Sequence, residues 1–460
     1  MKTIFKKSSG ELQDVLTVTN SLGSLNLIKL AVPMFFEIVF NFLIGTVSTI
    51  VLSGYSEDAA AATGMASIVM NLFSILFTGI AGGCSVLVSN LIGAECIRKA
   101  QSACFSLIVL LAGLGLGCNG VLWLGAPNIA AWMNLTGEVH SMAVVYLRGR
   151  SLELLFLAVY SILIALMRCY GYSKSAVFIG AVTNVVNVLC SIYAVYYAEI
   201  EVLSGVSGVA LGASLSRFIG CSAAIVLIFV YKIKFAVPEG FGEFCALVKR
   251  ALYLGIPTCI SNGSFTFSQI VTNSFTVLLG VYAGSAKVYF TNILCYSYVF
   301  SNCVGMATSI LVGRLCGAGN HTHARKLTGT VVKFTVPANA TISILIFLFR
   351  VPLLSLFTNN QAIISMSFGI MLVDILIEMA RGVSHVYESA LRAANDVNLT
   401  MLVTLVSSWV FSVGLGYILA IPCNMGLLGF WAALAVDEFV RAAYTCLRWK
   451  SNRWSTKIKI

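Results

Sequence analysis

One apolar segment occurs twice in the chain, at a fixed separation. Residues 85–94 read SVLVSNLIGA and residues 309–318 read SILVGRLCGA, so the two copies begin 309 − 85 = 224 residues apart. The same shift carries Pro33 to Pro257 and Arg168 to Arg392 without a gap. Two copies of one helical unit in a membrane-embedded chain are typical of carriers whose site lies between the copies. The repeat therefore predicts two homologous lobes.

The composition places most of the chain in a membrane. Hydrophobic residues make up 58% of the 460 and charged residues only 10%, whereas soluble proteins carry about 25% charged residues. Apolar stretches of roughly 20 residues can cross a bilayer as helices. We expect twelve such spans, at residues 25–54, 61–89, 103–125, 139–167, 174–198, 206–231, 250–280, 288–312, 328–349, 362–391, 398–420 and 426–447.

The net charge of +11 follows the membrane pattern rather than that of a nucleic-acid binder. Lysines and arginines concentrate in alternate connections between the spans, as at 98–99, 232–234 and 325–326. This positive-inside pattern predicts that both termini are cytoplasmic. Arg148 and Arg150, at the outer start of the fourth span, are exceptions. They either snorkel to the interface or pair with Glu153.

The longest charged connection divides the chain in two. We expect a cytoplasmic tail at 1–24, an N-lobe at 25–231, a cytoplasmic linker at 232–249, a C-lobe at 250–447 and a basic tail at 448–460. With six spans each, the lobes insert in the same orientation, so a pseudo-two-fold along the membrane normal relates them. The predicted fold class is an all-α integral membrane protein with twelve spans in two six-helix lobes.

Charged residues form one stripe in the tenth predicted span. Successive members are 4, 3, 4, 3 and 4 residues apart, so they share one helix face over about 27 Å. A charge in hydrocarbon costs at least a few kcal/mol, so this face cannot contact lipid. The stripe consists of Asp374, Glu378, Arg381, His385, Glu388 and Arg392.

Two neighbouring acids of this stripe predict an ion-coupling site. Asp374 and Glu378 are one turn apart and repel each other when buried, which a proton, a bound cation or Arg381 would relieve. Glu378 and Arg381 can also form a purely structural pair that orients the helix. Asp374 has no cation in its own turn, which favours the functional interpretation there.

In the first half, the deep acid is Glu37, one turn after Pro33. Asn41 lies a further turn along the same face, and the proline permits the helix to bend. Glu37 is either a proton or cation site or a partner in interhelical hydrogen bonds. Asn184 and Asn187 in the fifth span hold helices together in the simplest interpretation, and Asn187 is expected to face the cavity.

The chain offers little for enzyme chemistry. Its four histidines lie in separate segments, apart from an HxH pair at His321 and His323, and its fourteen cysteines form no CxxC pair. No GxxxxGK[ST] phosphate-binding loop is present, so uphill transport would draw on an ion gradient. We expect no metal and no cofactor other than a transported proton or sodium ion.

Several segments together resemble one known family. These are LAVPMFFE at 30–37, ILVGRLCGAG at 310–319, IEMAR at 377–381 and DEFVR at 437–441. In this order, and doubled at one offset, they resemble the bacterial multidrug and toxic compound extrusion (MATE) family over nearly the whole chain.

The resemblance implies an antiporter that exports amphiphilic, often cationic, organic molecules in exchange for protons or sodium. It implies alternating access of a central cleft, a bacterial plasma-membrane location and, we expect, a monomer. Glu378, Arg381 and Arg392 match family motif positions, as does Glu37 in one bacterial branch. Arg314 lies in the matching eighth-span motif.

The chain also departs from the family pattern. Ser48 occupies the position of the usual first-span aspartate, and Ser261 or Phe265 replaces a common seventh-span acid. Ser384 and Asn395 replace an asparagine and a glycine. The coupling hypothesis therefore moves to Glu37 and to the Asp374/Glu378 pair, while Ser48 is grouped with the cavity residues.

Three alternatives stay open at this point. A related two-lobe fold can serve as a flippase for a lipid-linked substrate, which a markedly basic cavity would favour. An integral-membrane enzyme needs a nucleophile–base or metal constellation that the chain does not display. A degenerate, non-transporting member fits the missing first-span aspartate.

Overall fold

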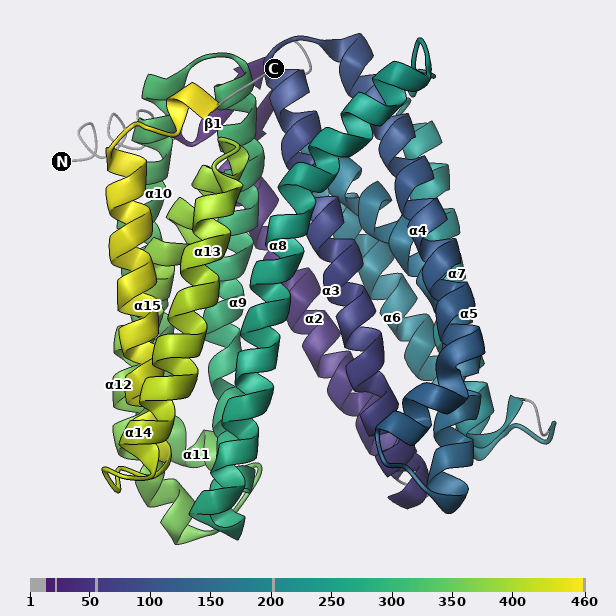
Figure 1. Cartoon of the computed structure of the whole chain (residues 1–460), viewed down its shortest axis with the longest axis vertical. Coiled ribbons are helices and arrows are strands. Elements are labelled where there is room, and N and C mark those ends of the chain that lie inside the picture. Colours follow the sequence, from purple (N-terminus) through teal and green to yellow (C-terminus); the bar gives the residue numbers. More distant parts are fainter. Residues whose placement is uncertain (1–13, 21–22, 54–56, 201–202, 458–460) are drawn as a thin grey trace, which may run out of the picture. The chain divides into compact units, whose positions relative to one another are not determined.

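A computed structural model describes residues 14–20, 23–53, 57–200 and 203–457. The side chains of 20, 43–53, 57–58, 60–61 and 281 lie outside this description. Figure 1 shows a helical molecule with one small strand pair. The strands are β1 (Thr17–Asn20) and β2 (Gly23–Asn26), and the long helices are α2 (Leu27–Ser53), α3 (Glu57–Gly93), α4 (Ile97–Trp132), α5 (Gly137–Cys169), α6 (Ser173–Tyr196), α7 (Gly205–Val230), α8 (Phe241–Thr276), α9 (Val281–Gly317), α10 (His321–Leu348), α12 (Gln361–Ala393) and α15 (Leu427–Lys450). The shorter elements are η2 (Val277–Leu279), α11 (Arg350–Ser355), α13 (Val397–Ser407), the π-helix η3 (Ser408–Leu415), α14 (Gly416–Ala420) and η4 (Ser455–Lys457).

Each predicted span corresponds to a long helix, with α13, η3 and α14 together forming the eleventh. By length and composition, ten helices in the described part of the chain can cross a membrane. The two others are α2, whose side chains are described only to Phe42, and α15, which carries Asp437, Glu438 and Arg441 in its middle. The prediction of an all-helical membrane protein is confirmed.

The described helices group into two compact units. Unit 1 comprises residues 1–35, 89–95 and 260–460, and unit 2 comprises residues 36–88 and 96–259. The repeat boundary predicted from the sequence lies at 232–249, but α8 begins at Phe241 and its first half belongs to unit 2. The short segment 89–95, from the first repeat, belongs to unit 1.

In unit 1, α12 packs against α9, α10 and α15. An apolar cluster fills the space between these helices, with Phe290, Met371 and Trp431 among its buried members. Burial of each such side chain contributes about 1.5–3 kcal/mol relative to exposure in water. The polar residues of α12 lie beside this cluster and are described below.

In unit 2, α5 packs against α4 and α7, and α7 packs against α6. The apolar cluster of this unit includes Leu163 and Met167 on α5, Ile179 on α6 and Ile228 on α7. Small residues bring the helices together: a Cβ on Gly149 would lie 2.7 Å from the Cβ of Ala210. Such close approach is common where membrane helices cross.

An antiparallel hairpin precedes the first helix, a feature that sequence analysis assigned to a polar tail. In it Thr17 pairs with Asn26 and Val18 with Leu25. Val18 and Leu25 are buried, and the side chain of Asn26 accepts from the backbone N–H of Ile28 at 3.0 Å. Asn26 thereby satisfies one of the free N–H groups at the start of α2.

The repeat is visible in the backbone at four helix ends. Glu95 and Gly319 follow α3 and α9 with φ of 58° and 72°, and they are 319 − 95 = 224 residues apart. Gly171 and Asn395 follow α5 and α12 with φ of 93° and 63°, again 395 − 171 = 224 residues apart. Left-handed C-cap positions favour glycine, and asparagine is the best-tolerated substitute. This explains why Asn395 can stand where the resembling family has glycine.

The same repeat forms a reciprocal helix crossing within unit 1. A Cβ on Gly93 would lie 2.0 Å from the carbonyl oxygen of Arg314. A Cβ on Gly317 would lie 2.0 Å from the carbonyl oxygen of Asn90. Since 93 and 317, like 90 and 314, differ by 224, each copy places its glycine on the other copy's backbone. A local pseudo-two-fold therefore relates the ends of α3 and α9.

Candidate functional site

The charged stripe of α12 faces the interior of unit 1. Asp374 is 2% exposed, Glu378 is fully buried and Arg381 is 8% exposed. The opposite face of the helix carries exposed apolar side chains, among them Leu372 and Leu376. This distribution is what a membrane requires, because charge on the lipid face would be costly. The prediction that the stripe avoids lipid is confirmed.

Arg381 joins acids from two helices. Its Nη1 lies 2.6 Å from Oε1 of Glu378 on α12, and its Nε lies 3.1 Å from Oε1 of Glu438 on α15. The guanidinium also stands over the ring of Tyr298 on α9, 5.1 Å from its centroid. The structural pair that the sequence suggested between Glu378 and Arg381 exists, and it is one half of a larger network.

A second arginine supports Glu438 from its own helix. Arg441 forms an ion pair with Asp437 one turn away, and its Nη2 lies 3.5 Å from Oε1 of Glu438. The Ser384 hydroxyl donates to Oε2 of Glu438 at 3.2 Å. These contacts make Asp437, Glu438 and Arg441 part of the site, although sequence analysis treated them only as a family motif.

Asn339 on α10 connects a third helix to Glu378. Its Nδ2 donates to the backbone carbonyl of Glu378 at 3.0 Å and lies 3.3 Å from Oε2 of the same residue. It also contacts the hydroxyl of Ser301 on α9. Asn339 is fully buried, so this amide fixes the position of α12 against α9 and α10.

Asp374 lies at the edge of this network, and one of its carboxylate oxygens is not used by it. Its Oδ2 has no hydrogen-bond partner among the described residues, and the described ion pairs of Arg381 go to Glu378 and Glu438. A buried carboxylate oxygen without a partner is costly unless it binds a proton or a cation. Asp374 thus differs from Glu378 and Glu438, whose carboxylates both pair with Arg381.

His385 is the fourth member of the stripe and packs on an aromatic ring. Its imidazole meets Tyr298 edge-on with centroids 5.4 Å apart, and its Nε2 has no hydrogen-bond partner in the described residues. At the cytoplasmic end of the stripe predicted from the sequence, Arg392 pairs with Glu388. The same oxygen, Oε1 of Glu388, also accepts from the hydroxyl of Thr404 at 3.4 Å.

In unit 2, Glu37 pairs with an arginine from α5. Its Oε2 lies 2.6 Å from Nη2 of Arg168, and both side chains are mostly buried. Gly180 on α6 permits this approach, since a Cβ there would lie 3.3 Å from Cγ of Glu37. Sequence analysis gave Arg168 no role in the site, because nothing local links it to Glu37, 131 residues away.

Asn41 extends the Glu37 cluster by one turn. Its Oδ1 accepts from Nδ2 of Asn184 at 2.5 Å, and its Nδ2 donates to the carbonyl of Glu37 at 2.8 Å. Asn187 is half-buried one turn further along α6. Asn184 is therefore the residue that touches the predicted site. Ser48 lies outside the residues whose side chains are described.

The prolines singled out from the sequence lie inside helices, Pro33 in α2 and Pro257 in α8. Each removes one backbone donor and frees a carbonyl within a long helix. Arg314 is buried at the end of α9, at the glycine crossing. Among the residues the structure describes, no group of three or more histidine, cysteine, aspartate or glutamate side chains could hold a metal ion.

A further charged network is centred on Asp396, in the connection between α12 and α13. Asp396 binds Nε of Arg448 at 2.7 Å and Nζ of Lys457 at 2.8 Å. Burial alone would raise the pKa of Asp396, but the hydrogen bonds and charges of these two cations outweigh it and lower the pKa below its ordinary value of 3.8. Trp454 stacks on Trp449 with centroids 4.2 Å apart and is fully buried. The C-terminal segment up to Lys457 is thus fastened to the helix ends.

The family model for MatE matches residues 33–192 and 257–418. Together these two matches cover more than half of the chain, and they begin at Pro33 and Pro257, one repeat apart. The chain belongs to the MATE family. The acid–arginine clusters described above are therefore those of a membrane transporter, and the resemblance noted in the sequence is confirmed.

Relatives cover nearly the full length. The chain is 27% identical over 436 residues to an uncharacterized transporter, YisQ, of Bacillus subtilis, covering 94% of this chain and 95% of the relative. It is 26% identical to a probable multidrug resistance protein, NorM, of Thermotoga maritima, covering 94% and 93%. A solved MATE family transporter of the MOP superfamily, in an outward-facing conformation, superposes with a TM-score of 0.86 at 18% identity, covering 94% and 96%. The last comparison establishes the two-lobe MATE fold.

Within this MATE transporter, the structure brings the predicted residues into two separate clusters. Asp374, Glu378 and Arg381 meet in unit 1, while Glu37 and Asn41 meet in unit 2. Sequence reasoning missed Glu438 and Asn339 in the first cluster and Arg168 in the second. A charge count on the last span was the available signal for Glu438, since three charged residues lie there within five positions.

Proposed function

We propose that this MATE transporter is an antiporter that exports amphiphilic, cationic organic molecules in exchange for protons or sodium ions. The observation that carries the proposal is Asp374, a buried acid beside Glu378 with an unpartnered oxygen. A proton or a sodium ion would satisfy that oxygen, and so would a cationic substrate group. Competition of this kind couples two fluxes, provided that the ion prefers one conformation.

The charge balance of the unit 1 cluster supports a cationic substrate. Four acids, Asp374, Glu378, Asp437 and Glu438, surround two arginines, Arg381 and Arg441. With all six groups ionised, the cluster carries a net charge of −2, which disfavours anionic substrates. A flippase for an anionic lipid-linked substrate would need the opposite balance, so we place it second. The similarity to NorM, a probable multidrug resistance protein, also favours multidrug export.

The Glu37–Arg168 pair supplies a second coupling element under this proposal. Protonation of Glu37 would break the 2.6 Å ion pair and release the end of α5 from α2. The carbonyl of Glu37 would keep its hydrogen bond from Asn41. Pro33, one turn before, gives α2 the means to bend when the pair separates. This arrangement would compensate for serine at position 48.

The decisive experiment is transport in proteoliposomes with imposed proton or sodium gradients and a panel of cationic dyes. The variant Asp374→Asn with Glu378→Gln should fold normally but lose gradient-driven accumulation of dye. Glu199→Gln, which changes an exposed acid outside the clusters, is the matched control. Normal gradient-driven transport by the double variant would refute the assignment. Unaltered dye flux in the wild-type protein with and without both gradients would refute coupling altogether.

The proposal includes a placement. The protein would lie in a bacterial plasma membrane as a monomer, with both ends of the chain on the cytoplasmic side. The basic residues near the described ends of α3, α7, α9 and α15 support this orientation by the positive-inside rule. No cofactor is proposed beyond the transported ion.

A further inference from the structure

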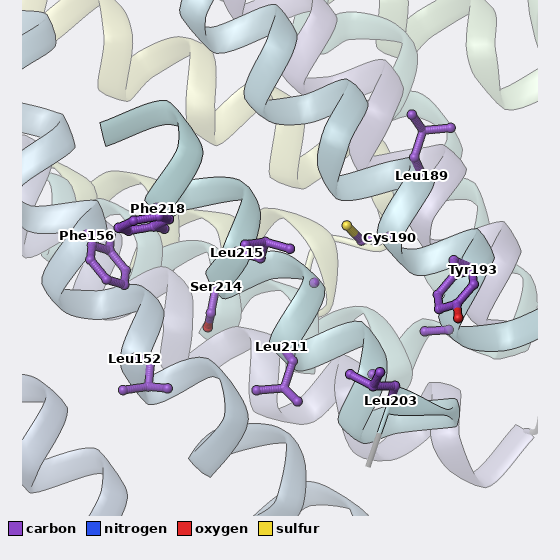
Figure 2. Close-up of a pocket in the computed structure, with 13 residues that line it drawn as sticks. Leu152, Phe156, Leu189, Cys190, Tyr193, Leu203, Leu211, Ser214, Leu215 and Phe218 are labelled. Carbon is purple, nitrogen blue, oxygen red and sulfur yellow. The ribbon is translucent and has the colours of Figure 1, made fainter. Parts of the chain in front are cut away.

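An apolar pocket of about 650 Å³ lies within unit 2, between α5, α6 and α7. Figure 2 shows Leu152 and Phe156 projecting from α5, Leu189 from α6, and Leu215 and Phe218 from α7. The volume is within the roughly 300–1,000 Å³ range of small-molecule sites. The pocket-lining residues of α6 lie on a different face from Asn184, so the pocket is distinct from the Glu37 cluster.

Because the pocket lining is almost entirely apolar, a hydrocarbon chain is the most suitable occupant. Two lining side chains carry a hydroxyl, Ser214 and Tyr193, and that of Ser214 already donates to the carbonyl of Gly149 at 2.9 Å. Leu189 is 59% exposed and Leu215 is 49% exposed, so the pocket is open at the surface. In a membrane-embedded helix bundle, such an opening takes an apolar chain rather than water.

The length of the pocket matches the thickness of the hydrocarbon layer of one leaflet. On α7 the lining residues run from Gly208 to Phe218, and ten residues of helix span about 15 Å. That is half of the roughly 30 Å hydrocarbon core. On α6 the lining reaches Tyr193, twenty residues from the helix start at Ser173, or about 30 Å. The pocket therefore begins at one membrane boundary and ends near the midplane.

A cation stands at the boundary end of the pocket. Arg148 precedes Leu152 and Phe156 by one and two turns, so all three share a face of α5. Arg148 is exposed and makes no described ion pair, whereas Arg150 lies 2.6 Å from Glu153. Twenty residues, or about 30 Å, separate Arg148 from Arg168 at the other end of the helix. Arg148 therefore reaches headgroup level on the side opposite Arg168.

We propose that this pocket binds one acyl chain of an anionic phospholipid whose phosphate pairs with Arg148. Under the proposed orientation, the lipid comes from the outer leaflet. The neighbouring charges do not compete, because Glu153 is already shared between Arg150 and Arg217. A lipid bound there would contact α5, α6 and α7 and hold them together near the Arg148 end of the pocket. The inference depends on the membrane placement but not on the transported substrate.

The first test measures lipid retention by native mass spectrometry of the purified protein. After the protein has been stripped of lipid in detergent, which is the starting material for all three tests, added phosphatidylglycerol should bind as one tightly held molecule, more readily than phosphatidylcholine with the same acyl chains. Arg148→Gln should weaken phosphatidylglycerol retention by about fivefold, as expected for one interfacial arginine, and leave phosphatidylcholine unchanged. Arg148→Lys should restore most of the preference. Equal retention of the two lipids by the wild-type protein would overturn the headgroup assignment.

The second test addresses the acyl pocket. Leu215→Trp fills the space from an exposed position, and Leu116→Trp is the matched control on α4, where the leucine is 56% exposed. The first variant should lose the tightly held lipid and the second should keep it. Both should show wild-type elution on size exclusion. Retention of the lipid by a folded Leu215→Trp protein would overturn the pocket assignment.

Cys190 provides a readout inside the pocket without any substitution. It lines the pocket from α6, and Cys118 on α4 is a similarly half-buried thiol away from it. Peptide mass spectrometry after N-ethylmaleimide treatment reports both sites in one sample. Added phosphatidylglycerol should slow alkylation of Cys190 several-fold and leave Cys118 unchanged. Equal rates at Cys190 with and without the lipid would overturn the proposal, whatever the outcome of dye transport.

Discussion

Arg381 on α12 binds Glu438 on α15 through an Nε–Oε1 contact of 3.1 Å, across 57 residues of sequence. Because Arg381 also holds Glu378, one buried cation satisfies two acids. The remaining acid of this group, Asp374, is left with an unpartnered oxygen. Within this group, Glu378 and Glu438 are satisfied by Arg381, whereas one oxygen of Asp374 is not.

Arg381→Met should destabilise the protein strongly. It leaves Glu378 and Glu438 buried without their shared cation, and breaking a buried pair costs about 3–5 kcal/mol. Thermal unfolding in detergent measures the loss. Adding Glu378→Gln and Glu438→Gln to the same variant removes the uncompensated charges and should recover a large part of it. An unchanged melting temperature in the single variant would show that Arg381 does not support the fold.

Asp374→Asn, unlike Arg381→Met, should impair transport without destabilising the protein. It removes a buried carboxylate with an unpartnered oxygen, so it should not destabilise the protein, while ion-coupled transport is lost. Asp437→Asn removes charged hydrogen bonds to Arg441 and should cost about 1.5–3 kcal/mol. Thermal unfolding of the two variants side by side, with transport assays, makes the comparison. Equal destabilisation by both would contradict the proposed division of roles.

Gly93→Ala and Gly317→Ala should each destabilise the protein by about 1–3 kcal/mol through overpacking. In both cases the new methyl group would lie 2.0 Å from a carbonyl oxygen of the other repeat. Gly113→Ala on α4 is the control, because a Cβ there meets nothing within 4 Å. It should be neutral or slightly stabilising, since alanine favours helix. Tolerance of alanine at position 317 would mean that the crossing is looser than described.

Glu95→Gly should stabilise the protein by about 1 kcal/mol. Glu95 is exposed and adopts φ of 58°, where a Cβ is strained and glycine is not. Asn395→Gly should gain less, because asparagine tolerates this conformation and its side chain contacts Asn90 at 3.3 Å. Chemical or thermal unfolding in detergent compares the pair. A loss of stability in Glu95→Gly would indicate a role for the carboxylate that the backbone does not reveal.

The contact between Asp396 and its two cations should weaken only in strong acid. Because the folded-state pKa is depressed, the stabilisation is complete above the ordinary pKa of 3.8 and disappears as the pH falls through the lower folded-state value. Fluorescence of the stacked Trp449–Trp454 pair should change over that acid range, with Trp454→Phe as the background control.

The matching variant for that titration is Asp396→Asn. It should show the loosened tryptophan signal at neutral pH and no further change on acidification, because the titrating group is gone. A full acid transition in Asp396→Asn would assign the signal to another group. A transition centred above the ordinary aspartate pKa in the wild-type protein would contradict the direction of the shift.

Features with a local period could be predicted from the sequence. The spans follow from runs of apolar residues, and the α12 stripe follows from acids and bases three or four residues apart on one helix. The 224-residue shift predicted the duplicated fold, and it holds down to the left-handed positions after α5 and α12. The same periodicity placed Asp374 and Glu378 on a buried face.

Contacts between distant helices could not be predicted in this way. The Glu37–Arg168 pair joins residues 131 apart, and its counterpart Arg392 pairs within its own helix instead. Arg168 and Arg392 lie at the ends of α5 and α12, and the distribution of charge along the sequence gives no information about their partners. Asn339 offered no pattern at all, since a buried amide has no sequence period. The roles of the site residues remain predictions.

Because the glycines of the two repeats pack against each other's backbone, the protein should not separate cleanly into its two sequence halves. Residues 89–95 come from the first half but are built into unit 1 with α9. A gene cut at 232–249 would yield an N-terminal fragment in which helix α3 ends in a surface shaped for a missing partner. The two fragments should associate through this crossing when they are produced together. Neither fragment should be soluble in mild detergent when it is produced alone.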